Sequence, residues 1–375
     1  MTAGSGASGA DYIVQMQPWL GEEEKKAVVD YLDSGGWLTE FRRTREFEQA
    51  LAAFIGARHV SVVMNGTVSL FAALAALGIG AGDEVIVPDL TMIASANAVL
   101  LTGATPRFVD IDRATLCLDL AQAERSITPR TKAIMLVSFN GRAPDMDRAV
   151  ALARDRGVFL VEDAAQALGS RWRGKHLGTF GAVGSFSFSS PKVITTGQGG
   201  ALATDDDALI AAIRKIKDFG RLRDGVDEHI ALGYNFKFTD LQAVIGLAQM
   251  TKLDWRVQRK KELFALYQAE LANVPEVTFV ETNLSETSPW FIDVLVPDPA
   301  ALRQFLHERG IGSRPFYPPI HTQAPYRLTG SFPETERASR QGLWLPSSSF
   351  LEDRAVRRIC DEIRAFYGGA PRTSA

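Results

Sequence analysis

The sequence predicts an α/β protein in which a large domain with a mostly parallel central sheet is followed by a smaller α+β domain. The first observation is that residues 45–240 alternate between helical and strand patterns, as in a doubly wound sheet. The second is that 375 residues exceed the size of one ordinary hydrophobic core. We therefore expect an N-terminal segment over residues 1–35 that packs with the small domain, a large domain over 36–250 and a small domain over 251–375.

The elements of the large domain follow from hydrophobic periodicity. Amphipathic or alanine-rich stretches predict helices over residues 47–54, 68–77, 95–101, 120–126 and 145–156. Short apolar runs predict strands over residues 59–64, 84–87, 105–109, 133–137 and 158–161, and alternating serines and phenylalanines predict another over 185–188. Gly78, Gly80 and Gly82 lie between a helix and a strand, the reverse of the order in a dinucleotide-binding fingerprint, which argues against such a site.

The small domain begins where this alternation stops. Helical periodicity without proline continues from Leu241 to Leu271 and predicts one helix of about 30 residues between the two domains. Beyond it, the patterns predict strands near residues 277–280 and 290–296, a helix over 299–309, a proline-rich loop over 314–325 and a last helix over 353–367.

Composition narrows the classes of function. A net charge of −3 gives neither the basic surface of a nucleic-acid-binding protein nor a basic face for membranes. No stretch reaches the roughly 18 apolar residues of a membrane-spanning helix, and the first ten residues lack the pattern of a secretory signal. The histidines are not spaced as metal ligands, and Cys117 and Cys360 lie on apolar segments, which predicts buried thiols. These features predict a soluble cytoplasmic protein without a metal site.

Lys192 is the residue that points most directly to chemistry. It follows the alternating strand pattern and precedes a glycine-rich turn, Thr196-Gly-Gln-Gly-Gly200. Upstream, the apolar run 158–161 ends in Glu162 and Asp163. An amine on a turn and a carboxylate at a strand end are the groups that pyridoxal phosphate (PLP) requires. The amine forms a Schiff base, and the carboxylate keeps the pyridine nitrogen protonated. In isolation, Asp163 could equally cap the next helix.

A phosphate site is predicted where the strand over residues 59–64 runs into Asn65-Gly-Thr67 and a helix. Backbone N–H groups at a helix N-terminus bind anions, and a glycine permits close approach. A Gly-Thr pair before a helix is common, so this pattern gains weight only beside the amine and the carboxylate. Ser187 either completes the phosphate site or is an ordinary strand serine, and Gln166 either contacts the ring oxygen or lies on a polar helix face.

Several short motifs lie in order along nearly the whole chain, from about Glu22 to Phe366. They are Asn65-Gly-Thr67, Gly82-Asp-Glu-Val-Ile-Val-Pro88, Gly103-Ala-Thr-Pro106, Phe108-Val-Asp110, Glu162-Asp-Ala-Ala-Gln166, Gly184-Ser-Phe-Ser-Phe188, Lys192, Thr196-Gly-Gln-Gly-Gly200, Gly233-Tyr-Asn-Phe-Lys-Phe238 and Arg314-Pro-Phe-Tyr-Pro-Pro-Ile-His321. Each motif alone is weak, but so many in this order are specific. The set resembles the DegT/DnrJ/EryC1/StrS family of PLP-dependent sugar aminotransferases, which implies PLP fold type I, the architecture of aspartate aminotransferase.

The resemblance implies roles for the matching residues at the cofactor. Lys192 would form the Schiff base and move the proton between the substrate Cα and the cofactor's C4′. Asp163 would pair with the pyridinium, and Gln166 would contact the ring hydroxyl. The residues that would bind the phosphate are Asn65, Gly66, Thr67 and Ser187.

The resemblance also implies partners beyond one cofactor site. Asn235 would reach the phosphate of the neighbouring subunit, which makes the enzyme a homodimer with shared active sites. Arg314, Tyr317 and His321 would lie near the cleft for a nucleotide-linked sugar.

Three positions depart from the family pattern. Met92 stands where an aromatic residue commonly stacks on the cofactor ring, and methionine can also pack against a ring face. Gln198 replaces a common glutamate in the glycine-rich turn, which removes one negative charge near the site. Lys237 replaces a common arginine after Asn235, which weakens any two-pronged contact at that position.

The resemblance implies an aminotransferase that works in two half-reactions. L-Glutamate would leave its amino group on the cofactor and depart as 2-oxoglutarate, and the amino group would then pass to a nucleotide-linked keto-deoxysugar. The similarity is greatest to perosamine-synthase-like members, which implies a 4-keto-6-deoxyhexose. A PLP-dependent sugar 3-dehydratase is disfavoured because such relatives replace the lysine with histidine. A non-catalytic PLP-binding regulator is disfavoured because roughly 45 residues precede the α/β region without a helix-turn-helix pattern or a basic stripe.

Overall fold

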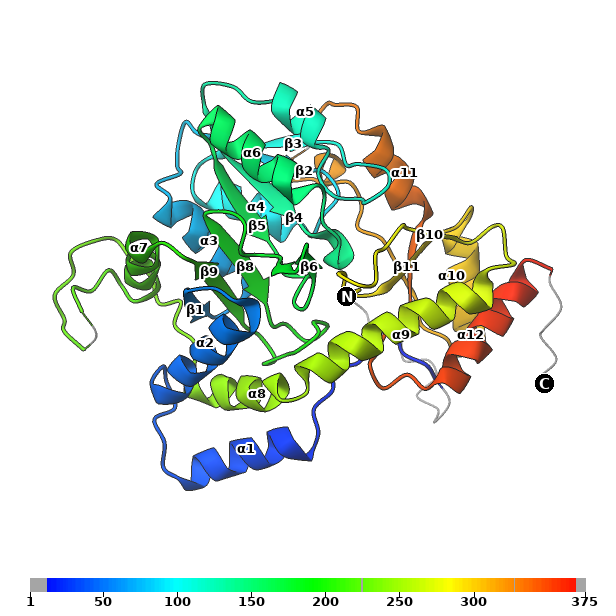
Figure 1. Ribbon diagram of the computed structural model, residues 1–375, viewed down its shortest axis with the longest axis horizontal. Helices are drawn as coiled ribbons and strands as arrows, with labels where there is room; N and C mark the ends of the chain where they lie inside the picture. Colours follow the sequence, from blue (N-terminus) through cyan, green and yellow to red (C-terminus); the bar gives the residue numbers. More distant parts are fainter. Residues whose placement is uncertain (1–11, 224, 327, 369–375) are drawn as a thin grey trace.

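A seven-stranded sheet with the order β1-β9-β8-β5-β4-β2-β3 forms the centre of the large domain in the computed structural model, which describes residues 12–223, 225–326 and 328–368 (Figure 1). Its strands are β1 (His59–Val63), β2 (Glu84–Pro88), β3 (Thr105–Val109), β4 (Thr131–Val137), β5 (Phe159–Asp163), β8 (Val183–Ser187) and β9 (Gly200–Thr204). The pairs from β3 through β2, β4 and β5 to β8 are parallel, whereas β9 pairs antiparallel with both β8 and β1. This confirms the predicted α/β class and the mostly parallel sheet.

Both faces of the sheet are buried under helices, because successive strand residues point to opposite sides. In β4, for example, Ile134 and Leu136 belong to one hydrophobic cluster, while Ala133 and Met135 belong to the other. The first cluster is covered by α2 (Arg42–Ile55), α5 (Leu120–Arg125), α6 (Met146–Arg156) and α8 (Asp240–Met250). The second is covered by α3 (Gly66–Ala76), α4 (Ala94–Leu101) and α7 (Asp207–Lys217).

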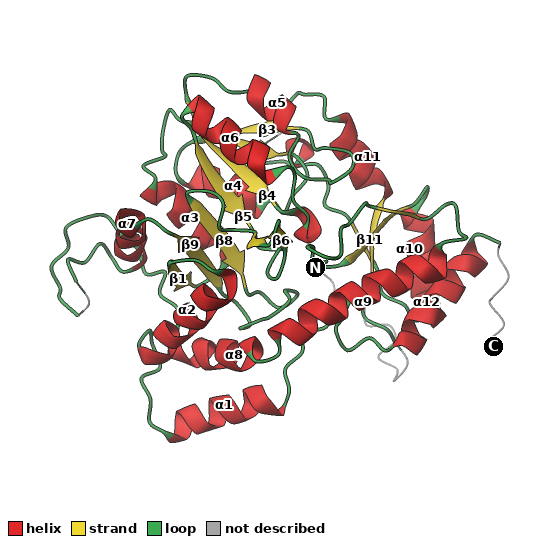
Figure 2. Cartoon of the chain, in the orientation of Figure 1, coloured by secondary structure: helices red, strands yellow, loops and turns green. Residues whose placement is uncertain are grey.

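The small domain is built on an antiparallel sheet with the order β10-β11-β13-β12 (Figure 2). Its strands are β10 (Thr278–Phe279), β11 (Ile292–Leu295), β12 (Arg314–Pro315) and β13 (Gly342–Leu345). On one face, Leu343 and Leu345 pack against α9 (Leu253–Leu271), α10 (Pro299–Glu308) and α12 (Asp353–Phe366). On the other face, Trp344 stacks on Phe139 of the large domain with ring centroids 6.2 Å apart. The predicted α+β character is therefore confirmed, and this second face joins the two domains.

The single helix predicted from Leu241 to Leu271 is wrong in one respect, because it is divided into α8 and α9 at Thr251 and Lys252. The turn closes with a bond from Lys252 N to Gln249 O of 3.1 Å. The side chain of Lys252 is paired with Glu23 and Glu24, at 2.8 and 2.9 Å, which draws the chain toward the N-terminal helix. Neither a glycine nor a proline marks this break, so periodicity alone could not locate it.

The N-terminal residues divide between the two domains. Ile13 bridges to Ile311 and Gln15 O accepts from Ser347 N, so the first described residues lie beside the small domain. Helix α1 (Glu22–Asp33) instead lies against α8 (Figure 1). Ile13 and Gln15 thus contact the small domain, whereas α1 contacts the large domain. The first ten residues, which lack a signal pattern, lie outside the described ranges. The domain boundaries stay a prediction.

Several remaining elements carried weak sequence signals. The structure adds the strands β9 and β13, and it places the short strand β12 at the start of the predicted proline-rich loop. It also adds α1, α7, α11 (Pro333–Gln341), the hairpin β6 (Arg171–Trp172) and β7 (Lys175–His176), and the short helices at Phe139–Gly141 and Ile320–Thr322. Cys117 and Cys360 are free and buried, as predicted. Within the described ranges, no helix has both the length and the apolar character needed to cross a membrane.

A buried ion pair connects the two domains. Arg142 follows β4, and both of its terminal nitrogens bond to the carboxylate of Asp293 in β11, one of them at 3.2 Å. Arg142 Nε also donates to Thr115 O at 3.0 Å. Because both side chains are buried, removal of either partner leaves an uncompensated charge in a medium of low dielectric constant.

We expect Asp293→Asn to lower the free energy of unfolding by about 3 kcal/mol, because Arg142 would lose its buried counter-charge. Asp30→Asn, which breaks the exposed pair with Lys26, should cost less than about 0.5 kcal/mol. Urea denaturation followed by fluorescence measures both. Equal midpoints for the two variants would contradict a role for the buried pair in joining the domains.

Candidate active site

The candidate site lies at the carboxyl ends of the sheet strands, where ligands bind in open α/β sheets. Asn65 follows β1, Asp163 ends β5 and Ser187 ends β8. These strands run in the same direction, because β1 and β8 are each antiparallel to β9. The sheet therefore brings three sequence-predicted residues to one edge.

Lys192 lies on the turn after β8, with its amine beneath a tryptophan. Its Nζ is 4.0 Å from the ring centroid of Trp290, which belongs to the small domain. Trp290 Nε1 donates to Pro191 O at 2.7 Å, which fixes the indole over the turn. Burial lowers the pKa of Lys192 to about 8, with Asp163 opposing and Arg314 adding to this shift. The amine is therefore partly neutral near physiological pH, as a nucleophile requires.

Asp163 is buried at the end of β5 with its carboxylate oriented by a serine. Ser95 Oγ donates to Asp163 Oδ2 at 2.7 Å, and Ala165 N donates to Oδ1 at 3.2 Å. Burial raises the pKa of Asp163, while Ser95, Ala165 and the charge of Lys192 oppose the shift. No helix follows Asp163 directly, and the bond to Ala165 N closes a turn, so the helix-capping interpretation considered from the sequence is wrong.

The start of α3 and the end of β8 form a close-fitting cradle. Asn65 caps the helix, with Oδ1 accepting from Val68 N at 2.9 Å. Gly66 and Thr67 open the helix, and the first N–H groups of a helix have no partner within it. A Cβ added at Gly66 would lie 3.0 Å from the Cβ of Ser187, so only glycine permits this approach without a shift. The cradle presents backbone donors and a hydroxyl, which suits a phosphate.

Gln166 is tied to the small domain through Asn140. Its Oε1 accepts from Asn140 N at 2.7 Å, so its Nε2 is the branch left to donate to a ligand. Asn140 Nδ2 donates to Phe291 O at 2.9 Å and its Oδ1 accepts from Phe291 N at 2.6 Å. These bonds fix the segment that carries Trp290.

The three residues predicted for the sugar cleft come from the segment over residues 314–321. Arg314 lies near enough to Lys192 to lower its pKa, and its guanidinium carbon is 5.6 Å from the ring centroid of Tyr317. Burial raises the pKa of Tyr317, so it is a neutral donor. His321 Nδ1 lies 2.5 Å from Asp89 Oδ2, and His321 N donates to Asp89 Oδ1 at 2.8 Å.

Comparison with known proteins decides the family. A model of the DegT/DnrJ/EryC1/StrS aminotransferase family matches residues 18–364. The chain belongs to this family. GDP-perosamine synthase of Escherichia coli O157:H7 is 38% identical over 360 residues, which cover 95% of this chain and 99% of the relative.

Solved structures agree with this membership. The aminotransferase TlmJ from Streptoalloteichus hindustanus superimposes with a TM-score of 0.91 at 34% identity, over 95% of this chain and 99% of that one. DesI, solved in the presence of its TDP-sugar product, gives 0.87 at 30% identity, over 96% and 94%. The protein is accordingly a PLP-dependent aminotransferase with the fold-type-I architecture.

The residues present fit the cofactor of this family. Lys192 and Asp163 lie near enough for each charge to shift the pKa of the other group. The cradle at Gly66 and Ser187 is so close that a side chain would fill it. Among the described residues, no cluster of three or more His, Cys, Asp or Glu side chains is placed to bind a metal ion.

Two further predicted residues, Asn235 and Met92, lie on loops next to this edge: Met64 N, directly before Asn65, donates to Phe236 O at 3.2 Å, and Met92 lies between β2 and α4. Asn235 lies on the exposed loop after α7, which projects from the large domain (Figure 1), and its backbone pairs with Asp218. Lys237 pairs with Asp218 at 2.7 Å, which gives this departure from the family pattern a local partner. Met92 precedes α4 with 45% of its surface exposed, and its carbonyl accepts from Ser95 N at 3.1 Å.

Four functional residues were missed from the sequence, each for a physical reason. They are Ser95, Asn140, Trp290 and Asp89. Ser95 lies on a helix far from β5 in sequence, and only the fold places it against the carboxylate. Asn140 has φ 54°, and its one signal in the sequence was the Asn140-Gly141 pair after a predicted strand, because these residues adopt positive φ more readily than others.

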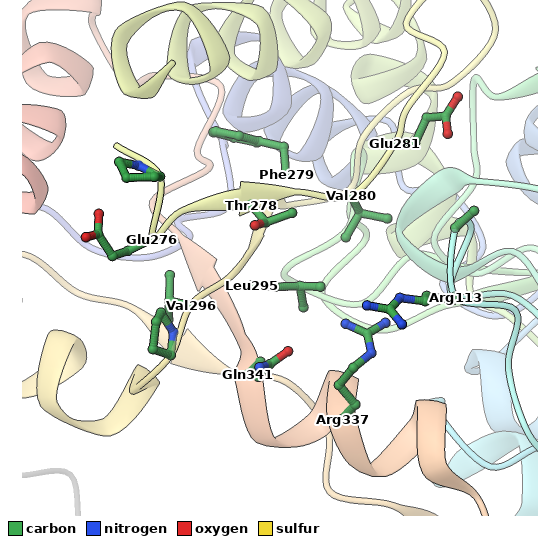
Figure 3. Close-up of a pocket in the computed structure, with 13 residues that line it drawn as sticks. Arg113, Glu276, Thr278, Phe279, Val280, Glu281, Leu295, Val296, Arg337 and Gln341 are labelled. Carbon is green, nitrogen blue, oxygen red and sulfur yellow. The ribbon is translucent and has the colours of Figure 1, made fainter. Parts of the chain in front are cut away.

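Two concave cavities lie elsewhere on the molecule. One, of about 350 Å³, is lined by residues of the small domain and by Arg113 (Figure 3). In this view Arg113 and Arg337 point toward one another from the two domains. A second, of about 530 Å³, lies between the first described residues and α12. Neither is lined by Lys192 or Asp163, so the functional site is defined by its chemistry rather than by cavity size.

The pKa of Lys192 generates a pH prediction. A lysine whose pKa is lowered loses its charge as the pH rises through that value, and the neutral amine is the reactive form. The rate of PLP capture by the apo-protein should therefore rise through pH about 8 and then level off. Arg314→Gln should move the midpoint upward and Asp163→Asn downward, because these charges act on the amine in opposite senses.

Stopped-flow absorbance at the cofactor's visible band measures this midpoint. Arg354→Gln, which removes an exposed arginine on the small domain, is the matched control and should leave it in place. A wild-type midpoint near the ordinary lysine value of 10.5 would show that burial does not act on this amine.

Proposed function

We propose that this protein transfers an amino group from L-glutamate to a nucleotide-linked 4-keto-6-deoxyhexose, with a GDP-linked sugar as the first candidate. The observation that carries the proposal is the Lys192 amine beside Asp163 at the strand ends. GDP-perosamine synthases from three bacteria are 35–38% identical to this chain over nearly its whole length, and DesI acts with a TDP-linked sugar at a lower identity of 30%. The greater similarity favours GDP.

The chain's own residues account for the steps of such a transfer. Bound PLP supplies the electron sink that permits proton loss next to nitrogen. Asp163, oriented by Ser95, keeps the ring nitrogen charged, and the cradle at Gly66 binds the phosphate. Lys192, with its lowered pKa, accepts and returns the proton. Arg314 offers a cation beside the amine for the carboxylate of glutamate or a phosphate of the nucleotide.

The alternatives have less support. A sugar 3-dehydratase of this fold would have histidine in place of lysine at the cofactor, and position 192 is lysine. A non-catalytic PLP-binding regulator would have no need of an amine whose pKa is lowered toward neutrality. No contact in the described structure favours either one.

The proposed assembly is a cytoplasmic homodimer in which Asn235 serves the partner's phosphate site. The loop that carries Asn235 exposes apolar side chains, among them Leu232 with 77% of its surface exposed. Further apolar side chains are exposed along α1 and the segment after it, namely Val29, Leu32, Trp37, Leu38 and Phe41. Such contiguous exposure favours burial against a second copy. Buried free thiols agree with a reducing compartment.

The activity is tested by spectrum and product. The purified protein should show the visible band of bound PLP, L-glutamate should bleach it, and a GDP-linked 4-keto-6-deoxyhexose should restore it with an aminated product detected by mass. Lys192→Ala should lower turnover at least about 10⁴-fold, since it removes both the attachment and the proton carrier. Lys175→Ala, which removes an exposed lysine, is the control.

A panel of GDP-, dTDP- and UDP-linked keto-sugars separates the parts of this proposal. Turnover with dTDP-sugars alone would overturn the GDP assignment and retain the aminotransferase. A bound cofactor that glutamate cannot convert would overturn the donor. No visible band that depends on Lys192 would overturn the site itself.

The shared site predicts complementation between inactive subunits. Lys192→Ala and Asn235→Ala subunits carrying different tags are co-expressed, and dimers with both tags are isolated. If Asn235 acts across the interface, each mixed dimer contains one intact site and should have about half the wild-type activity. If Asn235 acts within its own subunit, activity should not exceed half that of the Asn235→Ala dimer.

A further inference from the structure

Helix α9 carries two buried cations on one face, one turn apart, at Arg256 and Lys260. Buried lysine and arginine side chains are rare, because removing their charge or their hydrogen-bonding groups from water costs several kcal/mol. Neither has a buried acidic side chain as a hydrogen-bonding partner in the described structure. Their hydrogen bonds go to backbone carbonyls and one side-chain amide. These acceptors include the residue directly after Lys192 and the residue whose ring lies over its amine.

Lys260 contacts the segment that carries Trp290, whose ring covers the Lys192 amine. Its side chain has 0% of its surface exposed, and its Nζ donates to Trp290 O at 2.9 Å and to Ser347 O. Burial lowers the pKa of Lys260 to about 7, with Arg256 adding to the shift. A neutral amine keeps two N–H donors, so both carbonyls remain satisfied in either state. Lys260 thus fixes the backbone of the residue whose ring lies 4.0 Å from Lys192 Nζ.

Arg256 contacts the turn that follows Lys192. Its Nη1 donates to Val193 O at 2.9 Å, the carbonyl of the residue directly after Lys192, and to Gln249 Oε1 at 2.7 Å. Gln249 Oε1 also accepts from Thr195 N at 3.2 Å, so the same group fixes the turn at a second point. Nη2 donates to Trp19 O at 2.9 Å, which ties this arrangement to the N-terminal segment.

We propose that Arg256 and Lys260 are positioning residues of the reaction, which set the distance between the Lys192 amine and the Trp290 ring from a single rigid helix. The two sets of hydrogen bonds are independent. Arg256 binds the turn that carries the Lys192 amine, and Lys260 binds Trp290, whose ring covers this amine. A displacement of either by about 1 Å alters both the orientation of the amine and the shielding of its charge. The proposal rests on Lys192 as the cofactor lysine and not on the identity of the sugar.

A purely structural role accounts less well for the choice of residue. The surroundings of Lys260 are apolar, including Phe264 and Phe291, and an apolar side chain would pack there without the cost of desolvation. What an apolar side chain cannot do is donate to the two carbonyls. The benefit of the amine is therefore the fixed position of Trp290 and of Ser347, whose Oγ accepts from Ile292 N at 2.8 Å.

The test compares Lys260→Met with Lys252→Met in the holoenzyme. Methionine keeps the length and the unbranched shape of lysine but has no donor. Lys252 directly precedes α9, has only 10% of its side chain exposed and pairs with Glu23 and Glu24 of α1, so its replacement controls for lost stability. Lys260→Met should lower kcat for the glutamate half-reaction at least about tenfold, with KM changed less than about threefold.

A second readout does not depend on turnover. The pH midpoint at which the visible band of the bound cofactor titrates should move by at least about half a unit in Lys260→Met, since the ring above Lys192 is displaced. It should stay in place in Lys252→Met. Lys260→Gln, which keeps two N–H donors on a shorter side chain, should recover part of both effects.

If Lys260→Met does not yield folded protein, Arg256→Lys provides the same two readouts, because it keeps the charge but reaches fewer of the three acceptors. An unchanged kcat and an unchanged midpoint in the folded variants would overturn the proposal. So would equal changes in Lys252→Met, which would assign the effects to stability alone. Failure of the proposed sugar specificity would leave these measurements intact, since they use glutamate and the cofactor band only.

Discussion

The structure depends on one constraint. The amine of Lys192 and the carboxylate of Asp163 are both buried away from bulk water, and the charge of each acts on the pKa of the other. Burial lowers the pKa of the amine and raises that of the carboxyl. Burial therefore disfavours the charged form of each group, whereas the charge of the other group favours it. Ser95 and Ala165 restore part of the carboxylate's preference for charge, whereas Arg314 further disfavours the charged amine. In the proposed function, this sets the pair for two tasks: Asp163 keeps a proton on the ring nitrogen, and Lys192 releases one near neutral pH.

The fold supplies the rigidity that this pair requires. Asp163 is fixed by its strand, but Lys192 lies on a turn, and turns are positioned only by what contacts them. Its contacts come from the small domain through Trp290 and from α9 through Arg256. The pairing of Arg142 with Asp293 and the stacking of Phe139 on Trp344 hold the domains in register. The site is therefore assembled by the interface between the domains, and neither domain alone contains it.

The sequence predicted six of the seven strands of the large sheet, five from short apolar runs and β8 from alternating serine and phenylalanine, but it did not predict β9. It also singled out Lys192, Asp163 and Gly66, because each lies at or soon after the carboxyl end of a predicted strand, and their roles stay predictions. It failed where tertiary contacts decide. The break at Lys252 depends on two glutamates of α1, and the roles of Ser95 and Trp290 depend on segments distant in sequence. No local pattern carries such information.

The segment over residues 314–321, which is predicted to bind the sugar, is attached to the same sheet edge as the residues predicted to bind the cofactor. Asp89 directly follows β2, and its carboxylate binds both the backbone N and the Nδ1 of His321, while its carbonyl accepts from Ile320 N at 3.0 Å. The bond at Nδ1 leaves Nε2 as the second ring nitrogen, which lies 4.0 Å from Glu336 Oε1. The segment that carries Arg314 and His321 is therefore positioned by a large-domain strand. In the proposed function, Arg314 and His321 therefore contact the sugar from a segment that is fixed to the same domain as Lys192.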